Sequence, residues 1–244
     1  VGGGNTAIDA VRTAVRLGID FKVFDFETEY KQKVVDYMLA EYQKGNTPNP
    51  DIMCNQEIKF KLFAETAFEQ GAEMIATGHY AQTDGKNLLK AADENKDQTY
   101  FLYRISEEVI PKTIFPVGGM TKPEVKKLAE GVGLTVAHKP ESMGVCFVGE
   151  ANMKDFLGEF IETRPGEIRE LESDKVLGMH DGAIFYTLGQ RHGLGLKTGL
   201  PYYVVRKDMD KNIVYVSRNL NSLSLWKKEI ELKDIIIRGD FDLS

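Results

Sequence analysis

The sequence comprises 244 residues, of which 42% are hydrophobic and 28% charged, with a formal net charge of −6. These values are typical of a soluble globular protein with one large domain or two modest ones. The acidic balance argues against indiscriminate nucleic-acid binding but is compatible with a specific RNA site. No apolar run approaches the ~18–20 residues that cross a bilayer, and no signal peptide is apparent. Because its two cysteines fit a reducing compartment, we expect a cytoplasmic protein without membrane contact.

The first half of the sequence alternates between helical and strand patterns. Apolar residues at helical spacing predict three helices: residues 6–17 before Gly18, a helix between its expected cap Thr28 and Gly45, and residues 56–69 before Gly71. Residues 21–26 and 74–77 are predicted as strands, and residues 46–53 as a loop with two prolines. This alternation predicts a parallel sheet with helices on both faces, whose ligands gather at the carboxyl ends of the strands.

The second half changes character after about residue 163. Before that point, Thr121 and Glu124 form a capping-box pattern that opens a helix ending at Gly131 or Gly133. Beyond it, β-branched and aromatic runs separated by Gly and Asp predict a smaller β-rich domain, with strands over residues 183–187, 202–206, 212–217 and 230–237. We therefore expect an α/β domain over residues 1–162, a β-rich domain over 163–229 and the start of a further β-barrel over 230–244.

Cys54 lies five residues after Asn49 in the run Asn49-Pro50-Asp51-Ile52-Met53-Cys54. If the next helix begins near Gln56, Cys54 lies near its N-terminus, where the helix dipole lowers a thiol pKa, and Asp51 is a candidate general acid or base. Asn49 and Asp51 are equally typical of plain turn and cap residues, which the spacing alone favours.

Cys146 also lies in a polar, turn-rich frame, Ser142-Met143-Gly144-Val145-Cys146-Phe147-Val148-Gly149-Glu150. With Cys54 it forms a candidate redox or sulfur-handling pair, although buried structural cysteines are the commoner kind.

Two further polar clusters are candidate ligand contacts. Gly78 and His79 follow the strand predicted at residues 74–77, where a glycine lets a ligand approach the backbone; a plain turn with a surface histidine is an equal alternative. Lys96, Asp97 and Gln98 precede an aromatic segment and are candidates for contacts with RNA phosphate and sugar, although a solvated helix start is the commoner meaning.

Seven sequence strings together resemble the tRNA-specific 2-thiouridylase family. The most specific is Thr47-Pro48-Asn49-Pro50-Asp51-Ile52-Met53-Cys54-Asn55-Gln56-Glu57-Ile58-Lys59-Phe60. The others occupy residues 76–80, 95–102, 115–116, 121–125, 144–150 and 187–195. Their order and spacing run from about residue 19 to the C-terminus, which makes the resemblance specific.

The resemblance implies a fold of the adenine nucleotide α-hydrolase type and a sulfur-transfer reaction. ATP, accompanied by Mg²⁺, would adenylate the C2 oxygen of the wobble uridine of tRNA. Cys146 would receive a persulfide from a cysteine desulfurase or a relay protein, and Cys54 would discharge it with a transient disulfide. The resemblance further implies that Asn49, Pro50 and Asp51 contact the target base and that Gly78 lies at the nucleotide. It places His79, Lys96, Asp97 and Gln98 at the tRNA.

Residues 1–18 depart from this resemblance. The family's ATP loop, a Ser-Gly-Gly-x-Asp-Ser run, is not in the sequence, which is expected to begin after it. We therefore expect the α/β domain to be truncated and this chain to be impaired or inactive when alone. Instead, Gly2-x-Gly4-x-x-Ala7 resembles a dinucleotide-binding segment of glutamate-synthase small subunits, with Asp25 at a following strand end as a ribose ligand. This leaves two alternatives, an NADPH-binding oxidoreductase fragment and an inactive tRNA-binding fragment.

Overall fold

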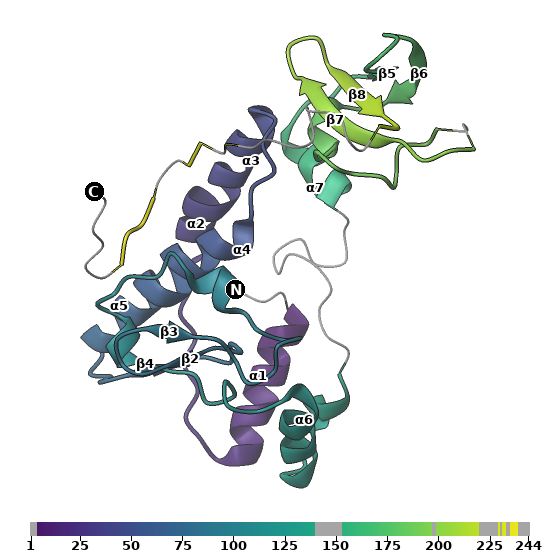
Figure 1. The fold of residues 1–244 in the computed structure, drawn as a ribbon. Helices are drawn as coiled ribbons and strands as arrows, with labels where there is room; N and C mark the ends of the chain where they lie inside the picture. Colours follow the sequence, from purple (N-terminus) through teal and green to yellow (C-terminus); the bar gives the residue numbers. More distant parts are fainter. Residues whose placement is uncertain are drawn as a thin grey trace. The chain divides into compact units, whose positions relative to one another are not determined.

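The computed structural model describes residues 4–139, 153–196, 199–219, 229, 231–232 and 235–238 (Figure 1). The chain divides into two compact units, each considered by itself. The first unit is built from residues 1–35, 49–150 and 236–244, and the second from residues 36–48 and 151–235.

The first unit opens with two helices that follow the predicted pattern in part. Helix α1 spans Gly4–Leu17 and ends at Gly18, whose φ of +66° favours glycine. Helix α2 spans Glu27–Tyr30 and continues as a π-helical turn, Lys31–Val35. The predicted cap Thr28 is wrong, because the Asp25 carboxylate already accepts a hydrogen bond from the Glu27 amide at 3.0 Å and Phe26 takes the cap position.

Residues 21–26 form no strand, contrary to the sequence prediction. β-propensity stabilises a strand only when a neighbouring strand supplies hydrogen bonds and packing, and no described strand pairs with this segment. Phe21 and Val23 are accordingly exposed. Asp25 therefore follows a coil, and its carboxylate accepts the first amide of helix α2, so it lacks the strand-end geometry expected of a ribose-binding carboxylate.

The helix that carries Cys54 begins earlier than predicted. Helix α4 spans Pro50–Met53, a π-helical segment spans Cys54–Leu62 and helix α5 spans Phe63–Glu69, so helical backbone runs from Pro50 onward. The prediction of a loop through residue 53 is wrong because proline suits the first helical position, where its missing N–H costs nothing. The predicted end is confirmed, since Gly71 adopts a φ of +91°.

We refer to the continuous helical segment of residues 50–69 as the long helix, and two short β-ladders follow it. Strand β1 (Ile75–Ala76) pairs in parallel with β4 (Thr113–Ile114), as an α/β fold requires, and β2 (Gln82–Thr83) pairs antiparallel with β3 (Leu88–Leu89). The 3₁₀ turns Thr99–Leu102 and Ile110–Lys112 join these strands.

The last helices of the first unit follow the predicted capping box. Helix α6 spans Lys122–Gly131 and a 3₁₀ turn spans Thr135–His138. The Glu124 carboxylate accepts the Thr121 amide at 2.7 Å, which confirms the capping box.

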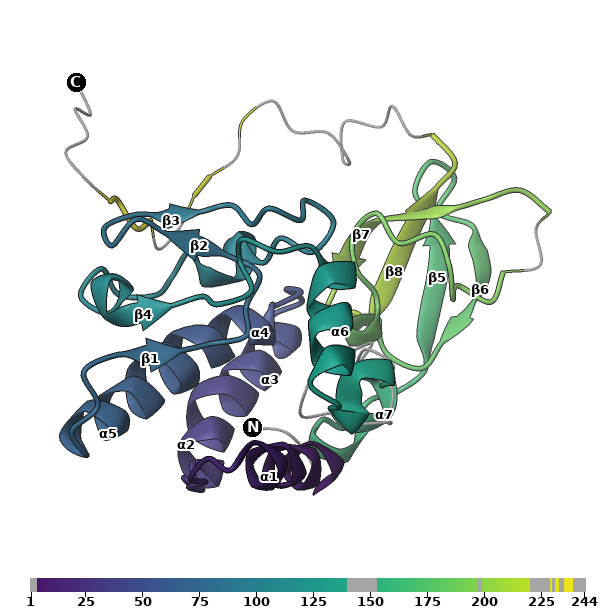
Figure 2. The ribbon, with the colours of Figure 1, turned by 90° about the horizontal axis from the view of Figure 1, so that it is seen from below.

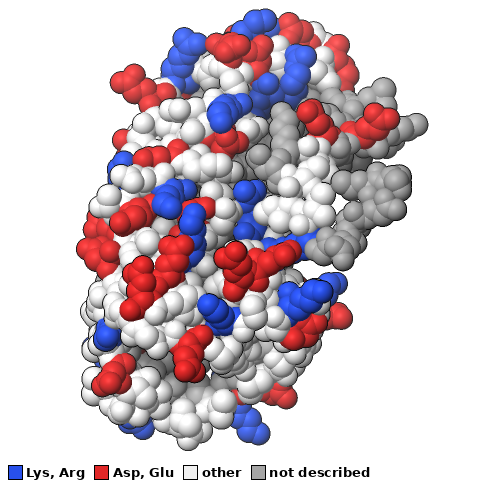
Figure 3. Space-filling model, turned by 90° about the vertical axis from the view of Figure 1, so that its left-hand side faces the viewer, with Lys and Arg blue, Asp and Glu red and all other residues white. Residues whose placement is uncertain are grey.

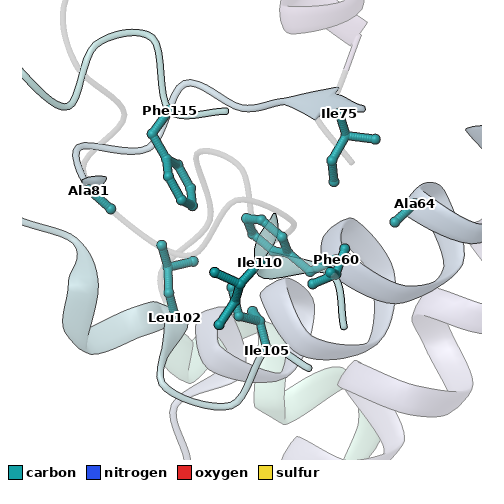
Figure 4. Close-up of a cluster of buried hydrophobic side chains, with 9 residues drawn as sticks. Phe60, Ala64, Ile75, Ala81, Leu102, Ile105, Ile110 and Phe115 are labelled. Carbon is teal, nitrogen blue, oxygen red and sulfur yellow. The ribbon is translucent and has the colours of Figure 1, made fainter. Parts of the chain in front are cut away.

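The core of the first unit joins the long helix to β1 and to the turns around it. Phe60 and Ala64 from the helix face Ile75 from β1, with Leu102, Ile105, Ile110 and Phe115 closing the cluster (Figure 4). Burying side chains of this size stabilises the fold by about 1.5–3 kcal/mol each. The helix and the carboxyl end of β1 are therefore packed as one body.

The second unit contains helices α3 (Asp36–Gln43) and α7 (Met153–Phe160) and a four-stranded sheet in the order β6-β5-β8-β7 (Figure 2). The strands span Gly166–Glu170 (β5), Val176–His180 (β6), Tyr203–Asp208 (β7) and Ile213–Ser217 (β8). Ile168, Val204, Val214 and Val216 are fully buried in its core. The β-rich character predicted after residue 163 is confirmed.

Three details of this unit differ from the sequence prediction. Ala183–Phe185 is a 3₁₀ turn, and none of the described strands pairs with it. Strands β5 and β6 were not predicted, since charged residues separate the apolar positions of β5 and a glycine interrupts β6. Residues 231–232 and 235 form no strand, nor do residues 236–237, which belong to the first unit, and residues 230, 233 and 234 lie outside the described part of the chain.

Gly118 holds the segment after β1 in place by close backbone contact. A Cβ at Gly118 would lie 1.6 Å from the Ala81 carbonyl oxygen, whereas one at Gly119 would have only the Gln82 side chain, at 3.9 Å. We expect Gly118→Ala to lower the free energy of unfolding by about 1–3 kcal/mol or more, because the clash is with backbone. Gly119→Ala is the matched control and should change it by less than about 0.5 kcal/mol. Urea unfolding measures both, and equal stability of the two variants would contradict this packing.

Candidate functional site

The start of the long helix places the Asn-Pro-Asp run. The Asn49 side-chain oxygen accepts the Asp51 amide at 3.1 Å and caps the helix, while Pro50 occupies its first turn. Asn49 is thus a helix cap, which agrees with the sequence interpretation of Asn49 as a turn or cap residue. Because the cap and the proline both restrict the backbone, Asp51 projects from a rigid first turn.

Cys54 is placed differently from the sequence prediction. It lies in the second turn of the helix and is 1% exposed, packed in a cluster with Val34 and Ile58. The helix begins at Pro50, so Cys54 lies further inside it than the predicted start near Gln56 implied, and its burial agrees with the alternative of a buried cysteine. Since the dipole effect falls off within the first turn, it supports the thiol less than predicted. Asp51, three residues earlier, lies on the same helix face.

Two effects act on the pKa of Asp51 in opposite directions. Partial burial raises the pKa of the Asp51 carboxyl above its ordinary value, and the nearby Lys59 ammonium counteracts part of this rise. A carboxyl with a raised pKa exchanges protons closer to neutral pH than an ordinary aspartate. That property suits a proton shuttle.

A hydrogen-bonded network joins the helix to the carboxyl end of β1. The Asn55 side-chain oxygen accepts the Lys59 Nζ at 2.9 Å and lies 3.2 Å from His79 Nε2. The Asn55 Nδ2 donates to the Phe101 carbonyl at 3.0 Å. His79 Nδ1 lies 3.0 Å from Thr77 Oγ1. We refer to Asn55, Lys59, His79 and Thr77 as the Asn55 network.

His79 is neutral in this network. Burial chiefly, and the Lys59 charge in addition, lower the pKa of His79 from 6.5 to about 4. Its ring also packs against Phe60, with centroids 5.5 Å apart. His79 is therefore neither the surface residue of one sequence alternative nor a side chain with a ring nitrogen to spare for a ligand, since both nitrogens face partners in the chain.

Gly78 is open in the structure. It is exposed, and no atom lies within 4 Å of the position where a Cβ would be. A ligand can therefore approach the backbone at the carboxyl end of β1, where open α/β sheets bind nucleotides. Gly78 therefore leaves the space that such a ligand would need.

The Lys96-Asp97-Gln98 segment is held by its own hydrogen bonds. Asp97 accepts from the Ala91 amide at 2.9 Å and from Thr99 Oγ1 at 2.6 Å, which help keep its pKa low despite burial. Gln98 exchanges two hydrogen bonds with the Tyr80 backbone, one through its amide and one through its side chain. Both side chains thus shape the loop, and Lys96 is the member with a charge suited to phosphate.

Sequence reasoning missed Asn55 and Lys59. They stand four residues apart on a helix, so they share one face, and Asn55 is 2% exposed. The available signal was this polar pair inside an otherwise apolar helical stripe. Cys146 lies outside the described residues.

Several classes of site are not found in the described part of the chain. No group of three His, Cys, Asp or Glu residues there is arranged to hold a metal ion. None of the described helices has the length and apolarity needed to cross a membrane. Basic and acidic side chains are interspersed over the face in Figure 3, without a dominant basic field.

Two family models and several curated proteins match the chain. A model described as the tRNA methyl transferase HUP domain matches residues 4–150, and one described as the tRNA methyl transferase PRC-barrel domain matches residues 154–218. Proteins named tRNA-specific 2-thiouridylase MnmA are similar to it. The one from Listeria welshimeri is 48% identical over 232 residues, and the one from Bacillus licheniformis is 45% identical over 232. The matches cover 93% of the chain and 62% of each relative.

The pH dependence of stability tests the neutral state of His79. Because the pKa of His79 is about 4 in the fold and near 6.5 in the unfolded chain, its contribution is complete above pH 6.5 and is lost as the pH falls toward 4. Between about pH 7.5 and about pH 5, we expect the wild type to lose about 1–2 kcal/mol relative to His79→Gln, which cannot protonate.

Urea unfolding at both pH values provides the measurement. His138→Gln is the control, since the His138 side chain is 79% exposed. A wild type and a His79→Gln variant with parallel pH profiles would show that His79 is not buried as described.

Proposed function

This chain belongs to the family of tRNA methyl transferase HUP domains followed by a PRC-barrel domain, and on that premise we propose that it carries out the sulfur-transfer steps of a tRNA 2-thiouridylase. The substrate of the proposed reaction is the wobble uridine of tRNA, whose C2 oxygen is exchanged for sulfur. The similar proteins from Listeria and Bacillus bear the name of this activity. We expect the protein to act in the cytoplasm, where thiols stay reduced.

One observation carries the proposal: Asp51 and Cys54 lie one helical turn apart on a capped helix that is bonded directly to the carboxyl end of β1. A thiol and a carboxyl with a raised pKa are the two groups that sulfur transfer to an activated carbon requires. Gly78 at the same strand end leaves room for the nucleotide. Asn49, Pro50 and Asp51 are the proposed contacts to the target base.

The proposed chemistry uses both cysteines. A persulfide on Cys146, supplied by a cysteine desulfurase or a relay protein, holds the sulfane sulfur. The Cys54 thiolate attacks the Cys146 sulfur, forming a Cys54–Cys146 disulfide and displacing the sulfane sulfur as hydrosulfide. The hydrosulfide adds to C2 of the activated uridine, and the activated oxygen departs. An external thiol then reduces the disulfide and restores both cysteines.

The burial of Cys54 sets a condition on this chemistry. Its thiol packs with Val34 and Ile58 and is 1% exposed, so the turn that bears it must shift before it reaches another sulfur. The backbone there is π-helical, with the Phe63 amide bonded to the Ile58 carbonyl five residues earlier. Single π turns are frequent at functional sites, which supports a role for this segment.

ATP is the proposed activating nucleotide, with Mg²⁺ bound through its phosphates. When bound, ATP converts the C2 oxygen into a leaving group. Gly78 is the residue of this chain that we assign to the nucleoside side. No Ser-Gly-Gly-x-Asp-Ser run occurs in the sequence, so we assign no residue to the phosphates.

For the tRNA, we propose Lys96 as a phosphate contact and His79, Asp97 and Gln98 as residues that shape the surface around it. Tyr100 and Tyr103 are 64% and 45% exposed beside this loop, and exposed aromatic rings are the surfaces on which unpaired bases stack.

The two alternative functions have less support. The family match includes residues 4–18, where the dinucleotide-binding resemblance lies, and the Asp25 carboxylate accepts the first amide of helix α2. An inactive tRNA-binding fragment differs from our proposal in the lack of an ATP-dependent product.

Incubation of the chain with tRNA, ATP and a persulfide donor tests the proposal in two stages. Intact-protein mass spectrometry should detect one added sulfur atom on Cys54→Ser, in which the Cys146 persulfide cannot be discharged, but not on Cys146→Ser. Nucleoside mass spectrometry should then detect 2-thiouridine for wild type and at least about 100-fold less for each serine variant.

Separate outcomes identify the other functions. A methylated uridine in place of 2-thiouridine would contradict sulfur transfer, and product formed by both serine variants would overturn the cysteine roles. Binding of NADPH, read by its fluorescence, would favour the oxidoreductase. Binding of tRNA without sulfur loading would favour the tRNA-binding fragment.

A further inference from the structure

Asn55 is a buried amide whose orientation is fixed by its partners. Lysine ammonium groups only donate hydrogen bonds and backbone carbonyls only accept them. The Asn55 atom that faces Lys59 Nζ at 2.9 Å must therefore be the oxygen, and the atom that faces the Phe101 carbonyl at 3.0 Å must be the nitrogen. The opposite orientation would leave both contacts repulsive.

The orientation of Asn55 in turn determines where His79 carries its proton. Because the Asn55 oxygen lies 3.2 Å from His79 Nε2 and cannot donate, that nitrogen must bear the hydrogen. In a neutral ring the other nitrogen, Nδ1, is then bare and accepts the Thr77 hydroxyl proton at 3.0 Å. The chain thus specifies a single tautomer of His79.

From these contacts we infer that Asn55 is a positioning residue of the sulfur-transfer site. It locks His79 as the Nε2–H tautomer and anchors the Lys59 ammonium on the helix face that also carries Asp51 four residues before Asn55. We call the three hydrogen-bonded contacts of the Asn55 side chain, with Lys59, His79 and Phe101, the lock. The lock rests on geometry alone, whereas its role in catalysis rests on the proposed function. One side chain ties the Cys54 helix to the end of β1 and to the 99–102 turn.

Lys59 gains a defined place through this lock. The positive charge of its ammonium acts on both Asp51 and His79 and lowers the pKa of each. Held by the Asn55 oxygen, it stabilises the ionised form of the Asp51 carboxyl and disfavours a second cation on His79. Without Asn55, a flexible lysine side chain samples other rotamers, and Asp51 loses a fixed counter-charge.

Two substitutions of Asn55 distinguish the effect of its hydrogen bonds from the effect of its volume in the core. Asn55→Leu fills a similar volume and removes all three hydrogen bonds. Asn55→Asp keeps the shape and the acceptor but loses the donor to Phe101 and adds a negative charge beside His79. Gln56→Ala is the matched control, because Gln56 lies on the next helix position and bonds Arg104 and Glu57 instead.

Long-range ¹H–¹⁵N spectra of the whole chain read the histidine tautomers directly. In wild type and Gln56→Ala, we expect His79 to carry its proton on Nε2 and to stay neutral at pH 6. In Asn55→Asp, we expect the His79 ring to become protonated at the same pH, since the new carboxylate stabilises the imidazolium. In Asn55→Leu, we expect a mixture of tautomers.

A wild-type His79 that carries its proton on Nδ1, or a His79 spectrum unchanged in Asn55→Leu, would overturn the lock. These spectra need no activity, so they remain informative if the proposed function fails.

Catalysis tests the positioning role. In the 2-thiouridine assay, we expect Asn55→Leu to lower kcat roughly 10- to 100-fold with little change in the KM for tRNA, because misplaced groups slow chemistry more than binding. Gln56→Ala should retain wild-type kcat. Full activity in Asn55→Leu would refute the positioning role. A wild type that gives the expected spectra but neither loads sulfur on Cys146 nor forms 2-thiouridine would refute the proposed function alone.

Discussion

Burial of the Asn55 amide is the constraint on which the arrangement of the site depends. An amide that is 2% exposed is costly unless its donor and its acceptor both find partners, and here they do so on three different segments. Because each bond has a fixed polarity, the helix, the strand end and the 99–102 turn fit together in one way. The apolar core beneath, from Phe60 to Phe115, stabilises this fit but does not specify it.

The first two turns of the same helix differ in rigidity and in exposure. The Asn49 cap and Pro50 fix the first turn, so Asp51 is held with little freedom. The second turn carries Cys54 into an apolar cluster, where the thiol is shielded. Sulfur transfer requires access to that thiol, and the hydrogen bonds of the π-helical segment are spaced more widely than those of an α-helix. A rigid first turn followed by an adjustable second turn suits a reaction in which the base stays fixed while sulfur moves.

Local patterns predicted much of this fold, and long-range contacts account for the differences. The ends at Gly18 and Gly71 and the Thr121 capping box follow from neighbours in sequence, and the structure confirms them. The strand at residues 21–26 depended on a partner elsewhere in the chain. Local pattern left the exposure of Cys54 open, because the helix start at Pro50 and the contact with Val34 decide it. Asn55 and Lys59 were missed because their importance depends on His79, which lies 24 residues away from Asn55.

A neutral His79 also sets the charge balance of the site. With its pKa near 4, His79 contributes no charge at neutral pH, so the network holds one permanent cation, Lys59. A single cation can stabilise an ionised Asp51 or a developing negative charge on an incoming group, but a second cation would bind such an anion too firmly to release it. The Asn55 network therefore does more than join three segments. Burial raises the pKa of Asp51, and by keeping His79 uncharged and Lys59 in place the network leaves a single positive charge to oppose that rise, an arrangement that suits the proposed proton transfer.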